Sequence, residues 1–302
     1  MTQSADNRSG VINALLAYAM WGIAPIYFKL LGQVSAPEIL VHRIIWSCVL
    51  LIIIVLAMGN WRKVQRIVGD AKMLAWLLLT ALILGANWLI FIWAINSGNI
   101  LEASLGYFIN PLFSVALGII FLGERLRKWQ TIAVLFALIG VVIQLFNVGS
   151  IPIIALSLAG TFGVYGLLRK KLMVESVPGL LIESALMLPL AIIYWLFFMD
   201  TPTSNMFANN TSLNITLIAA GLVTTAPLLC FTAAAKRLSL AAIGFFQYLG
   251  PTIMFILATV LYHEALMIEK LITFVFIWVA IVIYSWDSFR KIKQQRKLKK
   301  SA

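Results

Sequence analysis

Ten apolar blocks, each close to 20 residues long, dominate this sequence. They fall at residues 11–31, 37–58, 73–95, 100–122, 129–147, 151–168, 179–199, 211–232, 239–262 and 266–285. An α-helix needs about 20 apolar residues to cross the hydrocarbon core of a bilayer. A soluble helix buries only one apolar stripe, so ten helices that are apolar on every face would leave almost nothing to meet water. The sequence therefore predicts an all-α polytopic membrane protein with ten transmembrane helices.

The composition agrees with this class, and its few cysteines and histidines argue against metal or redox chemistry. Of 302 residues, 62% are hydrophobic and 11% are charged, whereas soluble domains carry about a quarter charged residues. No small-residue cleavage site follows the first block, so we interpret it as a retained span and not as a signal peptide. Cys48 and Cys230 lie within predicted spans and are expected to be packing residues. The two histidines lie far apart in the sequence, so we expect no metal and no cofactor.

The distribution of basic residues predicts the orientation in the membrane. If the N-terminus is inside, 20 of the 23 Lys and Arg residues fall on the inner side and only Lys270 falls outside. This asymmetry predicts that both termini are cytoplasmic. The basic tail at 286–302 is interpreted as an anchor near anionic lipid headgroups and not as a nucleic-acid-binding arm. The segment "NWRKVQRIVGDAK" is predicted to be an amphipathic linker on the same surface.

An internal repeat is visible when "INPLFSVALGIIFLGERL" (109–126) is compared with "LGPTIMFILATVLYHEAL" (249–266). Identical residues recur 140 or 141 positions apart: Pro111 and Pro251, Glu124 and Glu264, Lys29 and Lys170, Pro37 and Pro178. We therefore predict two five-helix repeats, at 11–147 and 151–285. Because five is odd, the second repeat must be inverted relative to the first. Inverted repeats are common in secondary transporters, where the solute binds between the halves.

Polar residues within the spans are the candidate site residues, because charged groups at such depth usually face a cavity or a partner. Lys29, His42, Arg43, Asn96 and Glu102 are predicted to form one polar layer in the outer part of the first half. Arg43 either contacts a solute or pairs with Glu102 and locks two helices together. Lys29 either joins the layer or extends to the outer headgroups.

A second set of uncharged and aromatic residues is expected at mid-depth: Asn87, Trp88, Tyr107, Asn110, Gln247 and Tyr248. These residues either line a solute cavity or tie helices together by hydrogen bonds. His42, Glu102 and Glu183 are the candidates for proton coupling. Glu124 and Glu264 lie at the ends of spans, where we expect them to stabilise turns.

Several longer stretches resemble a known family. "WGIAPIYFKLL", "PEILVHRIIWS", "FFQYLGPTIMFI" and the run from "NWLIFIWAIN" to "GIIFLGERL" are similar to the RarD proteins of the EamA group, in the drug/metabolite transporter superfamily. The resemblance covers about 10–290. It implies ten helices, cytoplasmic termini, a bacterial inner membrane and a permease role.

These observations together predict an inner-membrane permease that moves a small amphipathic metabolite or drug-like solute by alternating access. A cavity with Lys, His and Arg beside one Glu would suit a carboxylate-bearing or zwitterionic, amino-acid-like or aromatic solute. Analogy with the family favours efflux, and proton coupling is a further hypothesis. Two alternatives stay open: a membrane-embedded enzyme using His42 and Glu102 on a lipid-like substrate, and a passive channel. The expected partners are the solute and membrane lipids.

Overall fold

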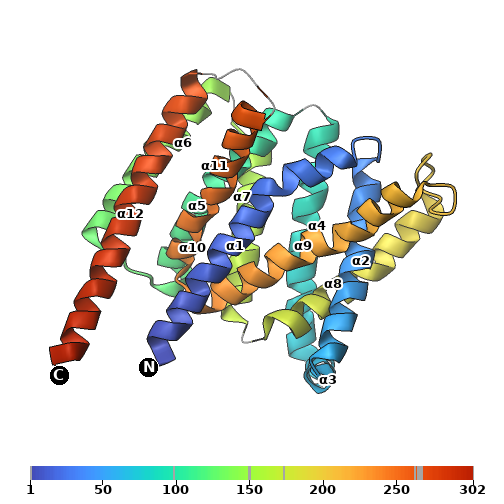
Figure 1. Cartoon of the computed structure of the whole chain (residues 1–302), viewed down its shortest axis with the longest axis horizontal. Coiled ribbons are helices and arrows are strands. Elements are labelled where there is room, and N and C mark those ends of the chain that lie inside the picture. Colours follow the sequence, from blue (N-terminus) through green and yellow to red (C-terminus); the bar gives the residue numbers. More distant parts are fainter. Residues whose placement is uncertain are drawn as a thin grey trace.

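The chain folds into a bundle of helices (Figure 1), with no strand in the parts that the structure describes. The computed structural model describes the backbone of residues 2–97, 99–148, 151–172, 174–261, 263 and 268–301. The helices are α1 (Thr2–Leu30), α2 (Ala36–Ala57), α3 (Trp61–Val68), α4 (Ala71–Asn96), α5 (Ile100–Leu122), α6 (Lys128–Val148), α7 (Ile153–Lys171), α8 (Ser176–Phe197), α9 (Thr211–Arg237), α10 (Leu240–Gln247), α11 (Leu249–Ile256), the π-helical segment η1 (Leu257–Leu261) and α12 (Ile268–Ser301).

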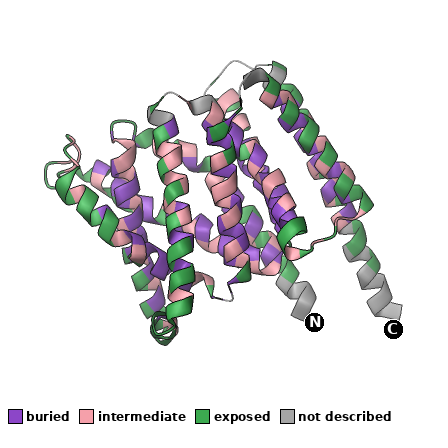
Figure 2. Ribbon diagram, turned by 180° about the vertical axis from the view of Figure 1, so that it is seen from behind, coloured by how far each residue is buried: buried purple, intermediate pink, exposed green. Residues whose placement is uncertain are grey.

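Ten of these helical segments are long and apolar enough to cross a bilayer, as the sequence predicts. In each segment only 22–50% of the most apolar window is buried inside the protein. The rest of each apolar face lies on the outer surface, where the exposed residues are concentrated (Figure 2). A surface this apolar is stable only when lipid covers it, so the chain is a multi-pass membrane protein.

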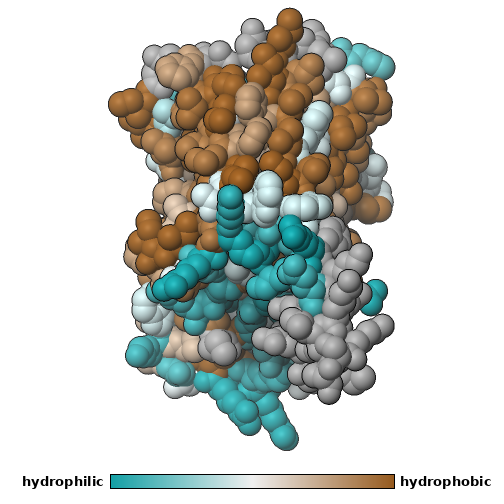
Figure 3. All heavy atoms as spheres, turned by 90° about the vertical axis from the view of Figure 1, so that its left-hand side faces the viewer, coloured by the Kyte–Doolittle hydropathy of each residue, from teal (hydrophilic) through white to brown (hydrophobic). Residues whose placement is uncertain are grey.

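The linker predicted between the second and third spans forms the short helix α3, which lies at the same end of the bundle as both chain termini (Figure 1). We call this end the basic face, and the other end the opposite face. Most of the basic residues lie there: Arg8, Arg62, Lys63, Arg66, Lys72, Arg125, Arg127, Lys128, Arg169, Lys170, Lys171, Lys236, Arg237, Arg290 and Lys291. Figure 3 shows hydrophilic side chains gathered towards this end and hydrophobic ones above them.

The two halves of the chain are interlaced. The first half comprises α1, α2, α4, α5 and α6, and the second comprises α7, α8, α9, the α10–η1 span and α12. Helix α1 packs against α9, and its counterpart α7 packs against α4; likewise α2 packs against α9, and α8 against α4. Helices α2 and α8, α5 and α10, and α6 and α12 pack against their own counterparts. Each of these contacts between halves is thus either matched by the equivalent contact when the halves are exchanged or joins two counterparts, as expected for an inverted repeat.

The fourth and ninth spans are counterparts, but they differ in continuity. Helix α5 is continuous through Pro111 and ends at Gly123, whose φ of 63° is left-handed and suits glycine. Its counterpart is divided at Tyr248 into α10 and α11, and it then continues as η1. A proline removes one backbone hydrogen bond, so Pro251 beside this division fits a bend in the ninth span.

Glu124 joins the halves at the basic face. Its Oε1 accepts a hydrogen bond from the Leu240 N–H at 2.6 Å and its Oε2 accepts one from the Ala241 N–H at 2.9 Å. A carboxylate at a helix N-terminus satisfies unpaired N–H groups and interacts favourably with the helix dipole. The expected turn-stabilising role of Glu124 is therefore confirmed, whereas Glu264 lies outside the described residues.

The closest approach of α2 and α9 depends on Gly221. A Cβ placed on Gly221 would lie 2.4 Å from the carbonyl carbon of Trp46, which is backbone and cannot rotate away. We expect Gly221→Ala to destabilise the protein by about 1–3 kcal/mol, the usual cost of overpacking, when thermal unfolding is measured in detergent. Gly85→Ala is the matched control, because its Cβ would meet only the Met187 sulfur at 3.5 Å. Equal stability of the two variants would contradict this packing.

Candidate functional site

A narrow cavity lies where the second and third spans of both halves meet. Its lining residues come from α2, α4, α8 and α9: Arg43, Ile44, Ser47, Leu51, Leu84, Trp88, Leu180, Glu183, Ser184, Met187, Thr224, Thr225 and Leu228. The space open to the centres of water-sized molecules is about 10 Å³, or room for about one ordered water. In this conformation the side chains that line the cavity therefore nearly fill it.

Arg43 reaches the cavity from the opposite face, because it lies two turns into α2, which begins at that end. Its guanidinium carbon lies 4.7 Å from the centroid of the Trp88 ring and 5.8 Å from that of Phe28. Its Nε donates a hydrogen bond to the Thr224 hydroxyl at 2.8 Å. Stacking on an aromatic face stabilises the cation and fixes the plane of the guanidinium.

Arg43 carries a charge that no acidic side chain among the described residues neutralises. None of the ion pairs in the described part of the chain involves Arg43. Within that same part, Thr224 is the one hydrogen-bond acceptor that the guanidinium has. The Nη1 and Nη2 groups are therefore available to a ligand, and their fork geometry matches a carboxylate or a phosphate. Thr225 also lines the cavity, and its hydroxyl is buried without a partner among the described residues.

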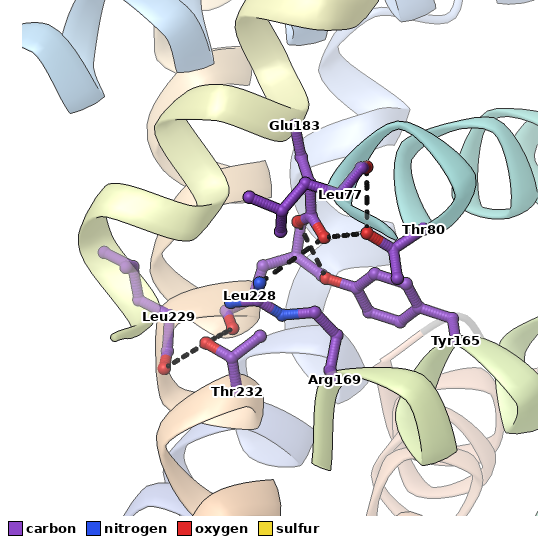
Figure 4. A network of polar contacts seen from close by, with 8 residues as sticks. All are labelled: Leu77, Thr80, Tyr165, Arg169, Glu183, Leu228, Leu229 and Thr232. Atoms are coloured by element: carbon purple, nitrogen blue, oxygen red, sulfur yellow. Dashed lines mark hydrogen bonds and ion pairs between the residues drawn. The ribbon is translucent and has the colours of Figure 1, made fainter. Parts of the chain in front are cut away.

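Glu183 marks the other end of the cavity and is fully compensated. It lies two turns into α8, which begins at the basic face. Its Oε1 accepts a hydrogen bond from the Thr80 hydroxyl at 2.5 Å, and its Oε2 accepts one from the Tyr165 hydroxyl at 3.3 Å. Arg169 forms an ion pair with it, with Nη1 at 3.5 Å from Oε1. These side chains converge on the carboxylate from α4 and α7 (Figure 4).

Arg169 is buried to an unusual degree for an arginine, with 2% of the residue exposed. Its three guanidinium nitrogens donate no hydrogen bond to any described residue. The side chain fits because Gly179 leaves space for it: a Cβ at Gly179 would lie 2.6 Å from Arg169 Nη1. A buried charge without its partner is costly, so Arg169 and Glu183 depend on each other.

The predicted polar layer is divided in the structure. Arg43 lines the cavity, whereas His42 is fully buried on another side of α2, with its ring 5.5 Å from that of Trp195. Glu102 does not pair with Arg43, since its Oε2 accepts a hydrogen bond from the Ile154 N–H at the start of α7, at 3.2 Å. Lys29 is exposed near the end of α1. The Asn96 side chain lies outside the described residues.

Three of the mid-depth residues tie helices together, as the alternative interpretation of the sequence allowed. Asn87 donates to the Leu158 carbonyl and to the Thr161 hydroxyl, which links α4 to α7. Gln247 accepts from the Ser114 hydroxyl at 3.3 Å, and Tyr248 donates to the Phe108 carbonyl at 3.3 Å.

The other three mid-depth residues have different surroundings. Trp88 stacks on Arg43. Tyr107 is 42% exposed, with its ring 6.2 Å from that of Phe91. Asn110 has a buried side-chain oxygen without a partner among the described residues.

Several residues of the site are absent from the sequence-based set. Thr224 and Thr225 of α9 line the cavity, and Thr224 contacts Arg43 of α2 across the interface between halves. No sequence signal marks this contact. Arg169 belongs to a run of three basic residues. The positive-inside rule already accounts for such a run on the cytoplasmic side, so nothing in the sequence marked Arg169 as a site residue. Glu38 could have been noticed, because it lies one helical turn before His42 on the same helix face, and the structure shows both residues fully buried.

Comparison with known proteins gives consistent matches along nearly the whole chain. A model described as the EamA-like transporter family matches residues 8–146. An uncharacterized transporter of Vibrio cholerae serotype O1 is 55% identical over 285 residues, which are 94% of each chain. Protein RarD of Salmonella typhimurium is 53% identical, with 97% of this chain and 98% of the relative covered. Protein RarD of Escherichia coli K12 is 52% identical, with 94% and 96% covered.

A solved crystal structure shares the fold at much lower identity. It is 18% identical, and the match covers 92% of this chain and 97% of the other, with a TM-score of 0.73.

Proposed function

Because this chain belongs to the RarD proteins of the EamA-like transporter family, in the drug/metabolite transporter superfamily, we propose that it is a secondary transporter that moves a small amphipathic solute by alternating access. The solute would bind between the two inverted halves, in the cavity between α2, α4, α8 and α9. We propose efflux as the direction and a bacterial inner membrane as the location. The accumulation of basic residues at the face with both termini supports an orientation with that face in the cytoplasm.

The observation that carries the proposal is the uncompensated charge of Arg43 in the cavity. Of the two charged residues that line it, Glu183 is paired with Arg169, whereas Arg43 has no acidic partner in the described chain. An unpaired charge away from bulk water is unfavourable. A solute carboxylate would remove that cost by binding both Nη groups, while Trp88 and the aliphatic lining would contact an apolar part. We therefore propose a carboxylate-bearing or zwitterionic solute, amino-acid-like or aromatic.

The test begins with identification of the solute. Purified protein would be screened for thermal stabilisation by amino acids and monocarboxylates, with matched compounds such as phenylalanine, 3-phenylpropionate and phenethylamine. We expect the compounds with a carboxylate to stabilise the protein and phenethylamine, which lacks one, to have no effect. Stabilisation by the amine alone would contradict the proposed role of Arg43.

Counterflow in proteoliposomes would then test the transport mechanism. We expect labelled solute to accumulate transiently against an excess of unlabelled internal solute, because a carrier exchanges one for the other. A passive channel would only equilibrate the label, and a membrane-embedded enzyme would convert it. Either result, obtained with a solute that stabilises the protein, would overturn the proposal.

A further inference from the structure

One hydroxyl in the lining of the cavity has no partner among the described residues. Thr225 of α9 lines the cavity together with Arg43, and 2% of the residue is exposed. Its Oγ1 atom is buried and forms no hydrogen bond with the described chain. A buried hydroxyl usually has a hydrogen-bond partner, because leaving it unsatisfied is unfavourable. Thr225 is therefore a candidate contact for a solute in the cavity.

The hydrogen bond that Thr225 lacks is one that other helical threonines of this chain form. Within a helix a threonine hydroxyl can donate to the carbonyl three or four residues earlier, as Thr161 and Thr232 do. For Thr225 the carbonyl four residues earlier is that of Gly221. This carbonyl instead accepts a hydrogen bond from the Ser47 hydroxyl of α2, at 3.3 Å. The packing of α2 against α9 therefore occupies the usual acceptor of Thr225 and leaves its hydroxyl to the cavity.

Thr225 directly follows the residue that holds Arg43. Thr224 accepts a hydrogen bond from Arg43 Nε at 2.8 Å, and consecutive Cα atoms are about 3.8 Å apart. All three side chains line the same small cavity. A solute whose carboxylate binds the Nη groups of Arg43 would therefore reach the Thr225 hydroxyl with a second polar group that lies close to that carboxylate.

The charges of the lining favour a neutral second group over an ammonium group. Glu183 is the acidic residue of the lining, and it is paired with Arg169. Arg43 has no acidic partner among the described residues. An anionic solute balances the charge of Arg43, whereas the ammonium of an amino acid would add a positive charge without a counter-charge. A hydroxyl can donate and accept a hydrogen bond, as that of Thr225 can, and it adds no charge.

We propose that the Thr225 hydroxyl binds a hydroxyl on the α-carbon of the solute, so that the site selects a 2-hydroxycarboxylate over the same acid without the hydroxyl. This role rests on the proposed function and narrows its solute class. A site that hydrogen-bonds a solute hydroxyl rejects the analogue that lacks it, because the buried protein group is then left unpaired. Ser47 is a positioning residue here, since it occupies the Gly221 carbonyl and keeps the Thr225 hydroxyl available.

Two acids with the same carbon skeleton test the proposal. Their affinities for the full-length protein in detergent would be measured by binding titration: 3-phenyllactate carries the α-hydroxyl and 3-phenylpropionate does not. We expect the parent to bind 3-phenyllactate at least about tenfold more tightly. Thr225→Val keeps the shape of the side chain and removes the hydroxyl, so it should bind the two acids with nearly equal affinity. Phenylalanine should bind the parent more weakly than 3-phenyllactate, because of its ammonium group.

Thr232→Val is the matched control on the same helix. Thr232 is 1% exposed, but its hydroxyl already donates to the Leu228 carbonyl at 2.9 Å. We expect Thr232→Val to keep the parent's preference for 3-phenyllactate. Without solute, Thr225→Val should unfold at a higher temperature than Thr232→Val, because it removes an unsatisfied hydroxyl and not a bonded one. Ser47→Ala leaves the Gly221 carbonyl to Thr225 and should reduce the preference several-fold.

Four results would overturn the proposal: a parent that does not distinguish the two acids, a Thr225→Val variant that keeps the preference, an equal loss of affinity for both acids in that variant, and tighter binding of phenylalanine than of 3-phenyllactate. If the acids bind through Arg43 and are exchanged in counterflow, but the preference does not depend on Thr225, this inference fails and the proposed function stands. If neither acid binds and counterflow shows no exchange, both fail.

Discussion

Replacement of Arg43 by alanine is expected to weaken solute binding by roughly 30-fold or more, because removing one member of a buried, hydrogen-bonded charge pair costs at least about 2 kcal/mol. Arg43→Lys keeps the charge but loses both the fork that matches a carboxylate and the stacking on Trp88, 4.7 Å away. We therefore expect Arg43→Lys to recover only part of the lost affinity. The measurement is a binding titration with a solute that stabilises the parent protein.

The control for this experiment is Arg62→Ala, which removes an exposed arginine from the basic face. We expect it to bind the solute like the parent. Thermal unfolding of each variant without solute would show whether the protein is folded. A folded Arg43→Ala variant that binds as tightly as the parent would place the solute elsewhere and remove the main support for the proposed function.

Loss of one member of the Arg169–Glu183 pair is expected to have the largest effect on stability. Both side chains are 1% exposed and have charged atoms 3.5 Å apart. Arg169→Met should therefore lower the free energy of unfolding by about 3–5 kcal/mol, since it leaves the Glu183 carboxylate buried without its cation. The double variant Arg169→Met with Glu183→Gln should be more stable than Arg169→Met alone, because no charge is then left unpaired. Thermal unfolding in detergent of these two variants and of Glu183→Gln alone would complete the double-mutant cycle.

An exposed ion pair provides the matched comparison. Lys63 and Glu175 lie 2.7 Å apart, with 44% and 56% of their side chains exposed. Pairs of this kind contribute about 0–1 kcal/mol, so the same double-mutant cycle should show little coupling. Additive losses at Arg169 and Glu183, with no rescue in the double variant, would mean that the buried pair is not coupled in the folded protein.

The sequence predicted the spans well because lipid imposes a simple rule. A segment that crosses a bilayer must satisfy its own backbone and present an apolar surface, and both requirements leave a local signal about 20 residues long. The duplication could also be detected in the sequence, because matching prolines and glutamates recur 140 or 141 residues apart. The division of the ninth span at Tyr248 was not, because Pro111 in its counterpart sits in a continuous helix. A proline at equivalent positions of the two repeats thus lies within a continuous helix in the first repeat and beside a break in the second.

The site was predicted only in part, because its contacts join residues far apart in the chain. The depth of Arg43 followed from its position in the span. Its partners depend on how α2 crosses α4 and α9, and therefore Thr224 and Trp88 could not be assigned from spacing alone. Glu102 lies at the expected level but caps α7. Arg169 could not be identified because it is one of three consecutive basic residues. The positive-inside rule accounts for such residues without any ion pair to a buried carboxylate.

The interlacing of the two halves has a consequence for how the protein is made. Most of the extensive helix contacts pair a segment from before residue 150 with one from after it. A ribosome that has delivered only the first five segments has therefore released a set of helices with few partners among themselves. Their polar groups, Arg43 included, must remain in the bilayer or at its surface until the later segments arrive. The first half therefore gains most of its packing partners only when the second half has been synthesised.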